Sequence, residues 1–364
     1  MNPCFAPDWY HDEAIFRREQ KLFEGLWAFA GVKQHLAQPD DYISAQIGRK
    51  SVFVQNFDGE LRAYENVCSH RFARLRPKTR GHGPVQCPYH AWTYNRDGIP
   101  DVIPKKPRFD HLTPERRRAL GLAPWQVAVC GSLIFVKAAA TGPSLAEFLG
   151  DAYAPLAAMT SAFGPLLDEN TMDIAANWKI VVENTLEGYH VAHVHAETFE
   201  RLKFRSIELK TEGLHTAWLA ELGEEFTQKS ARVNQVFQHR PFQISGYRHW
   251  LVFPNLTLAT TFGTSFAIQT IAPLSPGLTR FTSYVFGTQL KEELKGVSQT
   301  ISQALYDGVV AFNRKVFLED KAVVEFVHLG AAQTRGPGIL SDDELRVFRF
   351  QTDYVRLLNE LAPA

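Results

Sequence analysis

The sequence has few cysteines and no excess of charge of either sign. Four cysteines, Cys4, Cys68, Cys87 and Cys130, occur in 364 residues. They are too few for a disulfide scaffold and indicate a cytoplasmic protein. Lys and Arg together number 39, as do Asp and Glu, and the lack of a basic stripe argues against nucleic acid as a partner. There is no G-x-G-x-x-G fingerprint, so we expect any nicotinamide cofactor to bind another protein.

The sequence also lacks a long uninterrupted apolar run. Residues 249–279 contain no Asp, Glu, Lys or Arg, but Pro254, Gly263 and Pro273 interrupt the segment, which is rich in Thr. Buried strands of a sheet explain this composition better than a helix that crosses lipid. The first residues have no basic end followed by an apolar run, so an export signal is not expected. We therefore predict a protein without a membrane partner.

The order of helical and strand patterns predicts an α+β chain. Residues 12–29 carry apolar side chains at helical spacing. Farther along, short apolar runs flank Asp58-Gly59 and later Gly131, a pattern typical of antiparallel hairpins.

This pattern divides the chain into three parts. We expect a helical segment at 1–40 that packs on the last domain, a small antiparallel β domain at 41–140, and a larger domain at 141–364. The segment AAATGPS (138–144) is the expected linker.

The β domain carries a metal-binding pattern, C-x-H-x16-C-x2-H. Its members are Cys68, His70, Cys87 and His90. Each loop offers one thiolate and one imidazole, so two facing loops can place both sulfurs on one iron and both nitrogens on another. A zinc site with the same ligands is the alternative, although structural zinc sites usually pair like residues in sequence. Trp92 and Tyr94 follow the second loop and can shield a cluster from water.

A second group of metal-type residues lies in NWKIVVENTLEGYHVAHVH (177–195). Glu183, Glu187 and His190 follow one another at helical steps. His190 and His195 can meet one metal only if the helix ends or bulges between them, whereas His190 and His193 would meet on an unbroken helix. Helical spacing therefore favours His193 as the second ligand.

A ferrous site of the facial type needs one carboxylate besides two imidazoles. The candidate is the Glu319-Asp320 pair in NRKVFLEDKAVVEFVHLG. The alternative is a solvated helix face, because runs of charge are common on exposed helices.

The strings ENVCSHR and CPYHAWTY, with the second group, resemble the Rieske non-haem iron oxygenases, large (α) catalytic subunit. The resemblance covers nearly the whole chain. It implies an N-terminal antiparallel β Rieske [2Fe–2S] domain and a C-terminal helix-grip (START-like) catalytic domain with an antiparallel sheet and flanking helices. It places His70 and His90 on one cluster iron, and Cys68 and Cys87 on the other. Phe72 is a departure, since a small residue is usual there.

The same resemblance assigns the remaining site residues. It implies a mononuclear Fe(II) held by His190, His195 and Asp320, with His193 as the second choice to His195. Glu187 becomes a carboxylate that bridges His190 to the cluster histidine, by analogy His90, of a neighbouring subunit. Many ring-hydroxylating members have Asp there, and Glu recurs in members that act on quaternary amines such as carnitine.

The implied protein is the terminal component of an oxygenase system, a mono- or dioxygenase. It would use O2 and electrons from NAD(P)H, supplied by a separate reductase with or without a ferredoxin. It would hydroxylate or oxidatively demethylate a small aromatic compound or quaternary amine, as an α3 homotrimer. Aromatic residues in the expected strands of the second domain can line the substrate pocket. Two alternatives are a Rieske-type electron-transfer protein without a catalytic iron, and a zinc-stabilised binding module.

Overall fold

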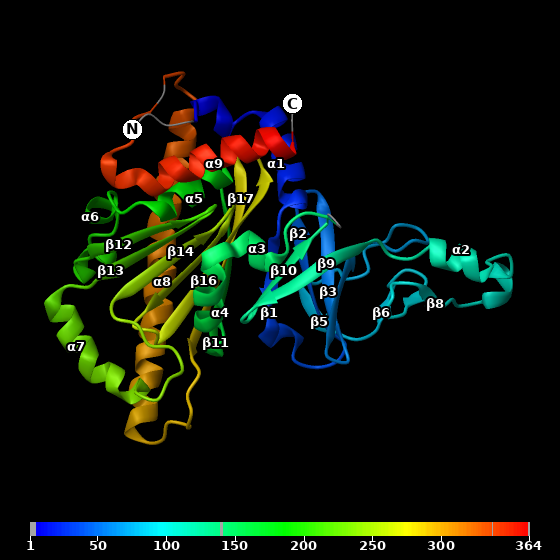
Figure 1. The fold of residues 1–364 in the computed structure, drawn as a ribbon, viewed down its shortest axis with the longest axis horizontal. Helices are drawn as coiled ribbons and strands as arrows, with labels where there is room; N and C mark the ends of the chain where they lie inside the picture. The colour runs from blue at the N-terminus through cyan, green and yellow to red at the C-terminus, as the bar shows by residue number, and fades with distance from the viewer. Residues whose placement is uncertain (1–4, 139–140, 337, 363–364) are drawn as a thin grey trace. The chain divides into compact units, whose positions relative to one another are not determined.

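The computed structural model describes residues 5–138, 141–336 and 338–362. Its contacts divide the chain into two compact units (Figure 1), one of Met1–Arg18 with Leu149–Ala364 and one of Glu19–Phe148. Cys4 and part of the expected linker lie outside the described residues.

The Glu19–Phe148 unit contains a seven-stranded antiparallel sheet in the order β1-β10-β9-β4-β3-β2-β5 and a small sheet in the order β6-β7-β8. The strands are β1 (Ala28–Val32), β2 (Asp41–Ile47), β3 (Lys50–Phe57), β4 (Glu60–Glu65), β5 (Arg80–His82), β6 (Val85–Gln86), β7 (Thr93–Tyr94), β8 (Pro100–Val102), β9 (Pro124–Cys130) and β10 (Leu133–Lys137). A short helix, α2 (Pro114–Ala119), precedes β9.

The turns of this unit follow from its sequence. Asp58 and Gly59 both have positive φ, 53° and 93°, which matches the twist of the β3 and β4 strands they join. The predicted hairpin across Gly131 is confirmed by the pairing of β9 with β10. Strand β1 was not predicted, because the apolar pattern of α1 (Glu13–Gly25) continues past the helix into the strand.

The larger unit contains a seven-stranded antiparallel sheet in the order β11-β17-β16-β15-β14-β13-β12. The strands are β11 (Phe163–Ile174), β12 (Arg205–Glu212), β13 (His215–Glu221), β14 (Tyr247–Val252), β15 (Leu256–Thr261), β16 (Ser265–Ser275) and β17 (Leu278–Thr288). The uncharged segment 249–279 therefore forms sheet strands, as predicted. Among the described residues, no helix has the length and apolar character needed to span a membrane.

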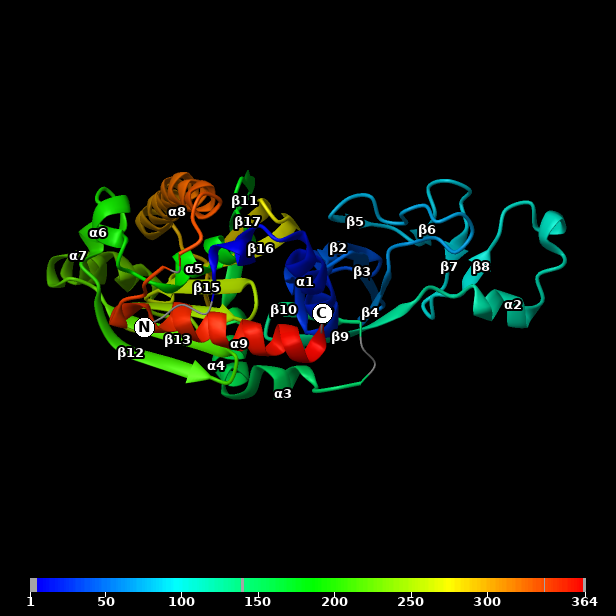
Figure 2. The same ribbon diagram turned by 90° about the horizontal axis from the view of Figure 1, so that it is seen from above.

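Helices α5 (Trp178–Leu186) and α8 (Val297–Ala331) contact strands of this sheet, as is typical of an α+β fold. The other helices of the unit are α4 (Tyr153–Thr160), α6 (Val191–Val194), α7 (Glu224–Asn234) and α9 (Leu345–Leu361), and α3 (Leu145–Leu149) lies at the boundary between the two units. The long helix α8 lies along one face of the sheet in both views (Figures 1 and 2). Helix α5 contacts α8, α9 and β16, so three elements hold it in place.

The start of α5 is held by Asn177. Its side-chain oxygen accepts a hydrogen bond from the Lys179 amide at 3.0 Å, which caps the helix. Its side-chain nitrogen donates to the carbonyls of Tyr10 and Pro276 at 3.0 and 2.8 Å. One residue thereby ties the helix to the N-terminal segment and to the turn before β17.

The middle of α5 is held by Glu183, whose carboxylate accepts hydrogen bonds from Tyr10 Oη at 2.9 Å and Gln351 Nε2 at 3.0 Å. Burial raises the pKa of Glu183 from 4.5 to about 7, against the opposing effect of these hydrogen bonds and of Lys179. The folded protein therefore binds this proton more tightly than the unfolded chain does. The free energy of unfolding should then fall as the pH rises from about 5 to 7.

We expect Glu183→Gln to remove this pH dependence. Between pH 5 and pH 8, the free energy of unfolding of the variant should rise by about 1–2 kcal/mol relative to that of wild type. This is less than the full linkage value because the side chain is only partly buried. Thermal unfolding of both proteins across this range measures it, with an expected relative shift of about 2–4 °C in Tm. A difference that stays constant with pH would contradict the assignment.

Candidate metal centres

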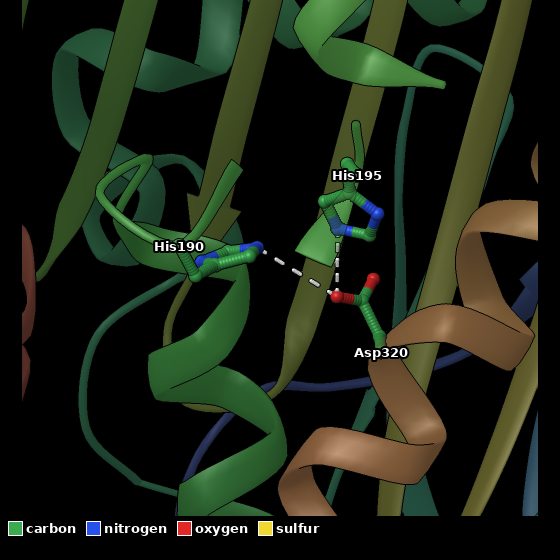
Figure 3. A group of neighbouring side chains, drawn as sticks. All are labelled: His190, His195 and Asp320. Atoms are coloured by element: carbon green, nitrogen blue, oxygen red, sulfur yellow. Dashed lines mark hydrogen bonds and ion pairs between the residues drawn. The ribbon is translucent and has the colours of Figure 1, made fainter. Parts of the chain in front are cut away.

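His190, His195 and Asp320 come together beside α8 (Figure 3). One ligand atom from each of the three lies within 4.8 Å of the others. Asp320 Oδ1 is 2.9 Å from His195 Nε2 and 3.7 Å from His190 Nε2, so both imidazoles point an Nε2 atom at the same carboxylate oxygen. Two imidazoles and one carboxylate form the donor set of a facial ferrous site.

The end of α5 decides which histidines meet. The helix ends at Leu186, and Glu187 has an extended backbone with φ −125° and ψ 163°. The chain turns before α6, which places His190 and His195 at the two ends of that short helix with their rings 5.1 Å apart. His193 lies on the exposed side of α6 and outside this group. The unbroken helix that favoured His193 is therefore absent.

Carboxylates outside the group orient both histidines. His190 Nδ1 is hydrogen-bonded to Glu187, which also accepts from the backbone amides of Tyr189 and His190. His195 Nδ1 is 2.8 Å from Glu319 Oε2. In each ring the Nδ1 contact leaves Nε2 directed at Asp320, an arrangement usual around metal-bound histidines.

Glu319 and Asn184 support this group, and neither was predicted to do so from the sequence. Thr198 Oγ1 donates to Glu319 at 2.7 Å, and Asn184 Nδ2 donates to Asp320 Oδ1 at 2.8 Å. Glu319 was part of the candidate Glu319-Asp320 pair, from which only Asp320 was assigned as a ligand. Its position directly before Asp320 was the available signal, because consecutive helical residues can reach neighbouring parts of one site.

The electrostatics of His195 fit a cation site. Burial acts to lower its pKa, but hydrogen bonds and charge from Asp320 and Glu319 outweigh this and raise the pKa. A dication in the same place would meet the same two negative charges.

A cavity of about 1360 Å³ lies within the larger unit, and its wall includes His190, His195 and Asp320. Some of the aromatic residues in this part of the chain were expected to line a pocket and the others to form core. Trp218, Phe262 and Phe266 line the cavity. Trp250, Phe253 and Phe286 are buried and absent from the cavity wall, so they form core. An apolar chamber with a few polar groups beside a metal site is typical of a small-molecule site.

In the other unit, the two Cys/His loops have the same internal hydrogen bonds. In each loop the backbone carbonyl of the cysteine accepts a hydrogen bond from the amide four residues later in the chain. The backbone amide of the same cysteine donates to the carbonyl five residues later, and this holds for both Cys68 and Cys87. The fourth residue after each cysteine has positive φ, 62° at Phe72 and 57° at Ala91. The repeated geometry presents two equivalent Cys/His pairs.

The side chains of these loops fit an iron–sulfur cluster. Cys68 and Cys87 are buried free thiols, and the rings of His70 and His90 lie 4.7 Å apart. The Nδ1 atoms of both histidines are buried without a hydrogen-bond partner among the described residues. Two buried imidazole nitrogens left without a partner are costly unless a ligand takes their lone pairs. Burial, with the nearby His90 and Arg71, lowers the pKa of His70 and keeps its ring neutral.

Trp92 and Tyr94 shield these loops, as predicted. Trp92 is 3% exposed and stacks on His70 with an interplanar angle of 2°. Tyr94 Oη lies 3.1 Å from Cys68 Sγ and accepts from the Ser69 amide at 3.0 Å. A hydrogen bond to a ligand sulfur is one means of setting a cluster's reduction potential.

Phe72 shows the consequence of the departure noted in the sequence. It adopts a left-handed backbone that usually favours glycine, and its side chain is 80% exposed. The bulky residue therefore alters the outer surface of the loop and leaves the four metal-type side chains in place.

Two features define a class of iron proteins. One is a unit with two Cys/His loops, and the other is a second unit with two histidines and one carboxylate beside a cavity. Members of this class join an iron–sulfur domain to a non-haem iron domain. The family described as "Ring hydroxylating alpha subunit (catalytic domain)" matches residues 167–360, and "Rieske [2Fe-2S] domain" matches residues 27–117. The chain belongs to the ring-hydroxylating α-subunit family, whose cofactors are a Rieske [2Fe–2S] cluster and a mononuclear iron. The predicted family, fold class and cofactors are confirmed.

Individual relatives agree with this family. The chain is 31% identical over 196 residues, 53% of its length, to the glycine betaine monooxygenase oxygenase subunit of Pseudomonas aeruginosa, of which 45% is covered. It is 33% identical over 199 residues, 52% of its length, to the anthranilate 1,2-dioxygenase large subunit of Acinetobacter baylyi, of which 42% is covered. The matched region spans less than half of each relative.

Among solved structures, the quaternary ammonium Rieske monooxygenase CntA in complex with L-carnitine has a TM-score of 0.79 and 21% sequence identity. The match covers 97% of this chain and 95% of that one. It shows that the two chains share a fold.

Proposed function

We propose that this chain is the catalytic subunit of a terminal Rieske oxygenase. It would use O2 and reductase-supplied electrons to hydroxylate or oxidatively demethylate a small aromatic compound or quaternary amine. The observation that carries this proposal is the convergence of His190, His195 and Asp320 on one point in a cavity wall. An electron-transfer protein would need neither this group nor the cavity. Relatives named for glycine betaine and for anthranilate represent the two substrate classes.

The residues have separate tasks in this proposal. Cys68, His70, Cys87 and His90 would hold the [2Fe–2S] cluster, and His190, His195 and Asp320 would hold the iron. When bound, the cluster would supply single electrons and the iron would activate dioxygen. Glu187 fixes the tautomer of His190 through Nδ1, and Glu319 does the same for His195. The cavity wall orients the substrate and limits access of water.

We also propose the assembly and the partners. A separate reductase, with or without a ferredoxin, would supply electrons drawn from NAD(P)H. In an α3 homotrimer, Glu187 would connect His190 to His90 of the partner subunit. One solved structure of CntA is described in terms of inter-subunit electron transfer, which supports this arrangement. We retain the proposed domains, 41–140 for the Rieske domain and 141–364 for the catalytic domain, and the cytoplasmic location.

Freshly purified protein tests this proposal directly. We expect a red-brown colour, a Rieske electron paramagnetic resonance signal on reduction, and about three irons per chain, two in the cluster and one mononuclear. A colourless protein containing zinc would overturn the cluster assignment and support a binding module. About two irons per chain with the Rieske signal, even after incubation with Fe(II), would indicate an electron-transfer protein.

A further inference from the structure

The cavity wall contains a buried cation, Arg346. The residue lies in the first turn of α9, and its side chain is 5% exposed. Its Nε donates to Thr216 Oγ1 at 3.0 Å, and its Nη2 lies 3.0 Å from His249 Nδ1. Thr216 and His249 belong to the paired strands β13 and β14, so these contacts fix the guanidinium against the sheet.

This cation has no counter-charge among the described residues. Thr216 is neutral, and burial together with Arg346 lowers the pKa of His249 well below its ordinary value, so that ring is neutral too. Burial lowers the pKa of Arg346 to about 10, with Tyr247 acting in the opposite direction and no carboxylate contributing. The guanidinium therefore stays charged at neutral pH.

Two arginine and lysine side chains of the same wall form ion pairs. Arg201 forms an ion pair with Glu197, and Lys203 with Glu200, and these side chains are largely exposed. A buried charge without a partner is costly, because desolvation is not repaid by an opposite charge. Arg346 therefore differs from Arg201 and Lys203 in both burial and pairing, which indicates a place for an anion.

The remaining donors suit a carboxylate. A guanidinium has five N–H groups in a planar fork, and the two contacts to Thr216 and His249 occupy two of them. The fork matches the two oxygens of one carboxylate. A phosphate dianion would call for a second cation near Arg346, and among the described residues no other cation acts on the pKa of Arg346.

The anion would lie in the same chamber as the metal group. Tyr247 lines the cavity. Burial makes the largest contribution to its pKa and raises it, while the charge of Arg346 lowers the pKa and the charge of Asp320 raises it. Tyr247 is thus close enough to sense both charges. Arg346 and the metal group line the same cavity, so a molecule held at Arg346 lies in the chamber that the metal group faces.

We propose that Arg346 binds the carboxylate of a small organic acid in this cavity and, resting on the proposed function, that this acid is the substrate. This narrows the substrate class to aromatic or quaternary-ammonium compounds that bear a carboxylate. It assigns to Arg346 a role in binding and orientation.

Calorimetric titration of the holoenzyme with matched acids and amides tests the proposal. The pairs are benzoate with benzamide, 2-aminobenzoate with 2-aminobenzamide, and glycine betaine with its primary amide. We expect at least one acid to bind about 100-fold more tightly than its amide, since a desolvated charge pair is lost in the amide. Equal binding within every pair, no binding by any acid, or tighter binding of inorganic phosphate would overturn the proposal.

Variants locate the preference on the chain. Arg346→Gln should abolish the preference for the acid, and Arg346→Lys should retain part of it, since the charge remains and the fork is lost. Arg349→Gln, an exposed arginine on the same helix, is the matched control and should bind like wild type. A preference that survives in a folded Arg346→Gln protein would overturn the assignment. If that variant does not fold, the acid–amide comparison in wild type decides.

The same samples separate this inference from the proposed function. Binding is measured without turnover, and iron content is determined on the same preparation. About two irons per chain with intact acid preference would refute the oxygenase and retain the anion site. About three irons per chain without a preference for the acid would refute the anion site and leave the oxygenase proposal standing.

Discussion

Asp320→Ala is expected to abolish product formation and to leave the colour of the protein unchanged. Asp320 contributes the carboxylate toward which both Nε2 atoms point, at 2.9 Å from His195 and 3.7 Å from His190. Without it, only two imidazoles would remain to hold the iron, and binding would be weak. The loss should exceed the roughly 100-fold effect typical of changes to residues that only support a ligand. Iron per chain should fall from about three to about two. Product analysis, metal analysis and the visible spectrum are the measurements.

A matched control distinguishes this effect from damage to α8. Asp307→Ala makes the same change at an exposed position of the same helix, where the side chain contacts Gln303. We expect it to retain about three irons and full turnover. Bleaching of the cluster in Asp320→Ala, or turnover close to that of Asp307→Ala, would count against Asp320 as a ligand.

The cluster loops could be assigned from the sequence because their information is local. Each loop carries its cysteine and histidine within four residues, and short-range backbone hydrogen bonds shape each loop in the same way. The hairpin at Asp58-Gly59 was predictable for a similar reason, since two positive φ angles require specific residue types. Local chemistry leaves little freedom at such places.

The group of His190, His195 and Asp320 was less predictable because it depends on tertiary structure. Spacing alone favoured His193, and only the end of α5 at Leu186 brings His195 beside His190. Glu319 resembles any charged residue on a helix until His195, from a distant part of the chain, lies against it. Arg346 gave no signal either. Its burial and lack of a counter-charge result from how α9 meets β13 and β14.

The two histidine-supporting carboxylates provide a matched pair of positions. Glu187 and Glu319 each contact the Nδ1 atom of one histidine of the group. Both side chains are largely buried, Glu319 at 20% and Glu187 at 13% exposure. Glu319 is also held by Thr198, whereas Glu187 is held by backbone amides at the turn after α5. If each carboxylate only oriented its histidine, the same truncation should have the same consequence at both positions. We propose a further role, electron delivery between subunits, for Glu187 alone.

Glu187→Ala is therefore expected to retain both metals and lose turnover. In Glu319→Ala, the affinity for iron should fall by about 10–100-fold, and turnover should recover when Fe(II) is added. In Glu187→Ala, excess Fe(II) should restore nothing, because the missing group is the proposed hydrogen-bonded connection between His190 and the cluster of the partner subunit. Stopped-flow absorbance should show the reduced cluster reoxidising at least about 100-fold more slowly than in wild type when O2 and substrate are added. Normal turnover in Glu187→Ala, or its rescue by Fe(II), would eliminate the bridge and leave Glu187 with the same supporting role as Glu319.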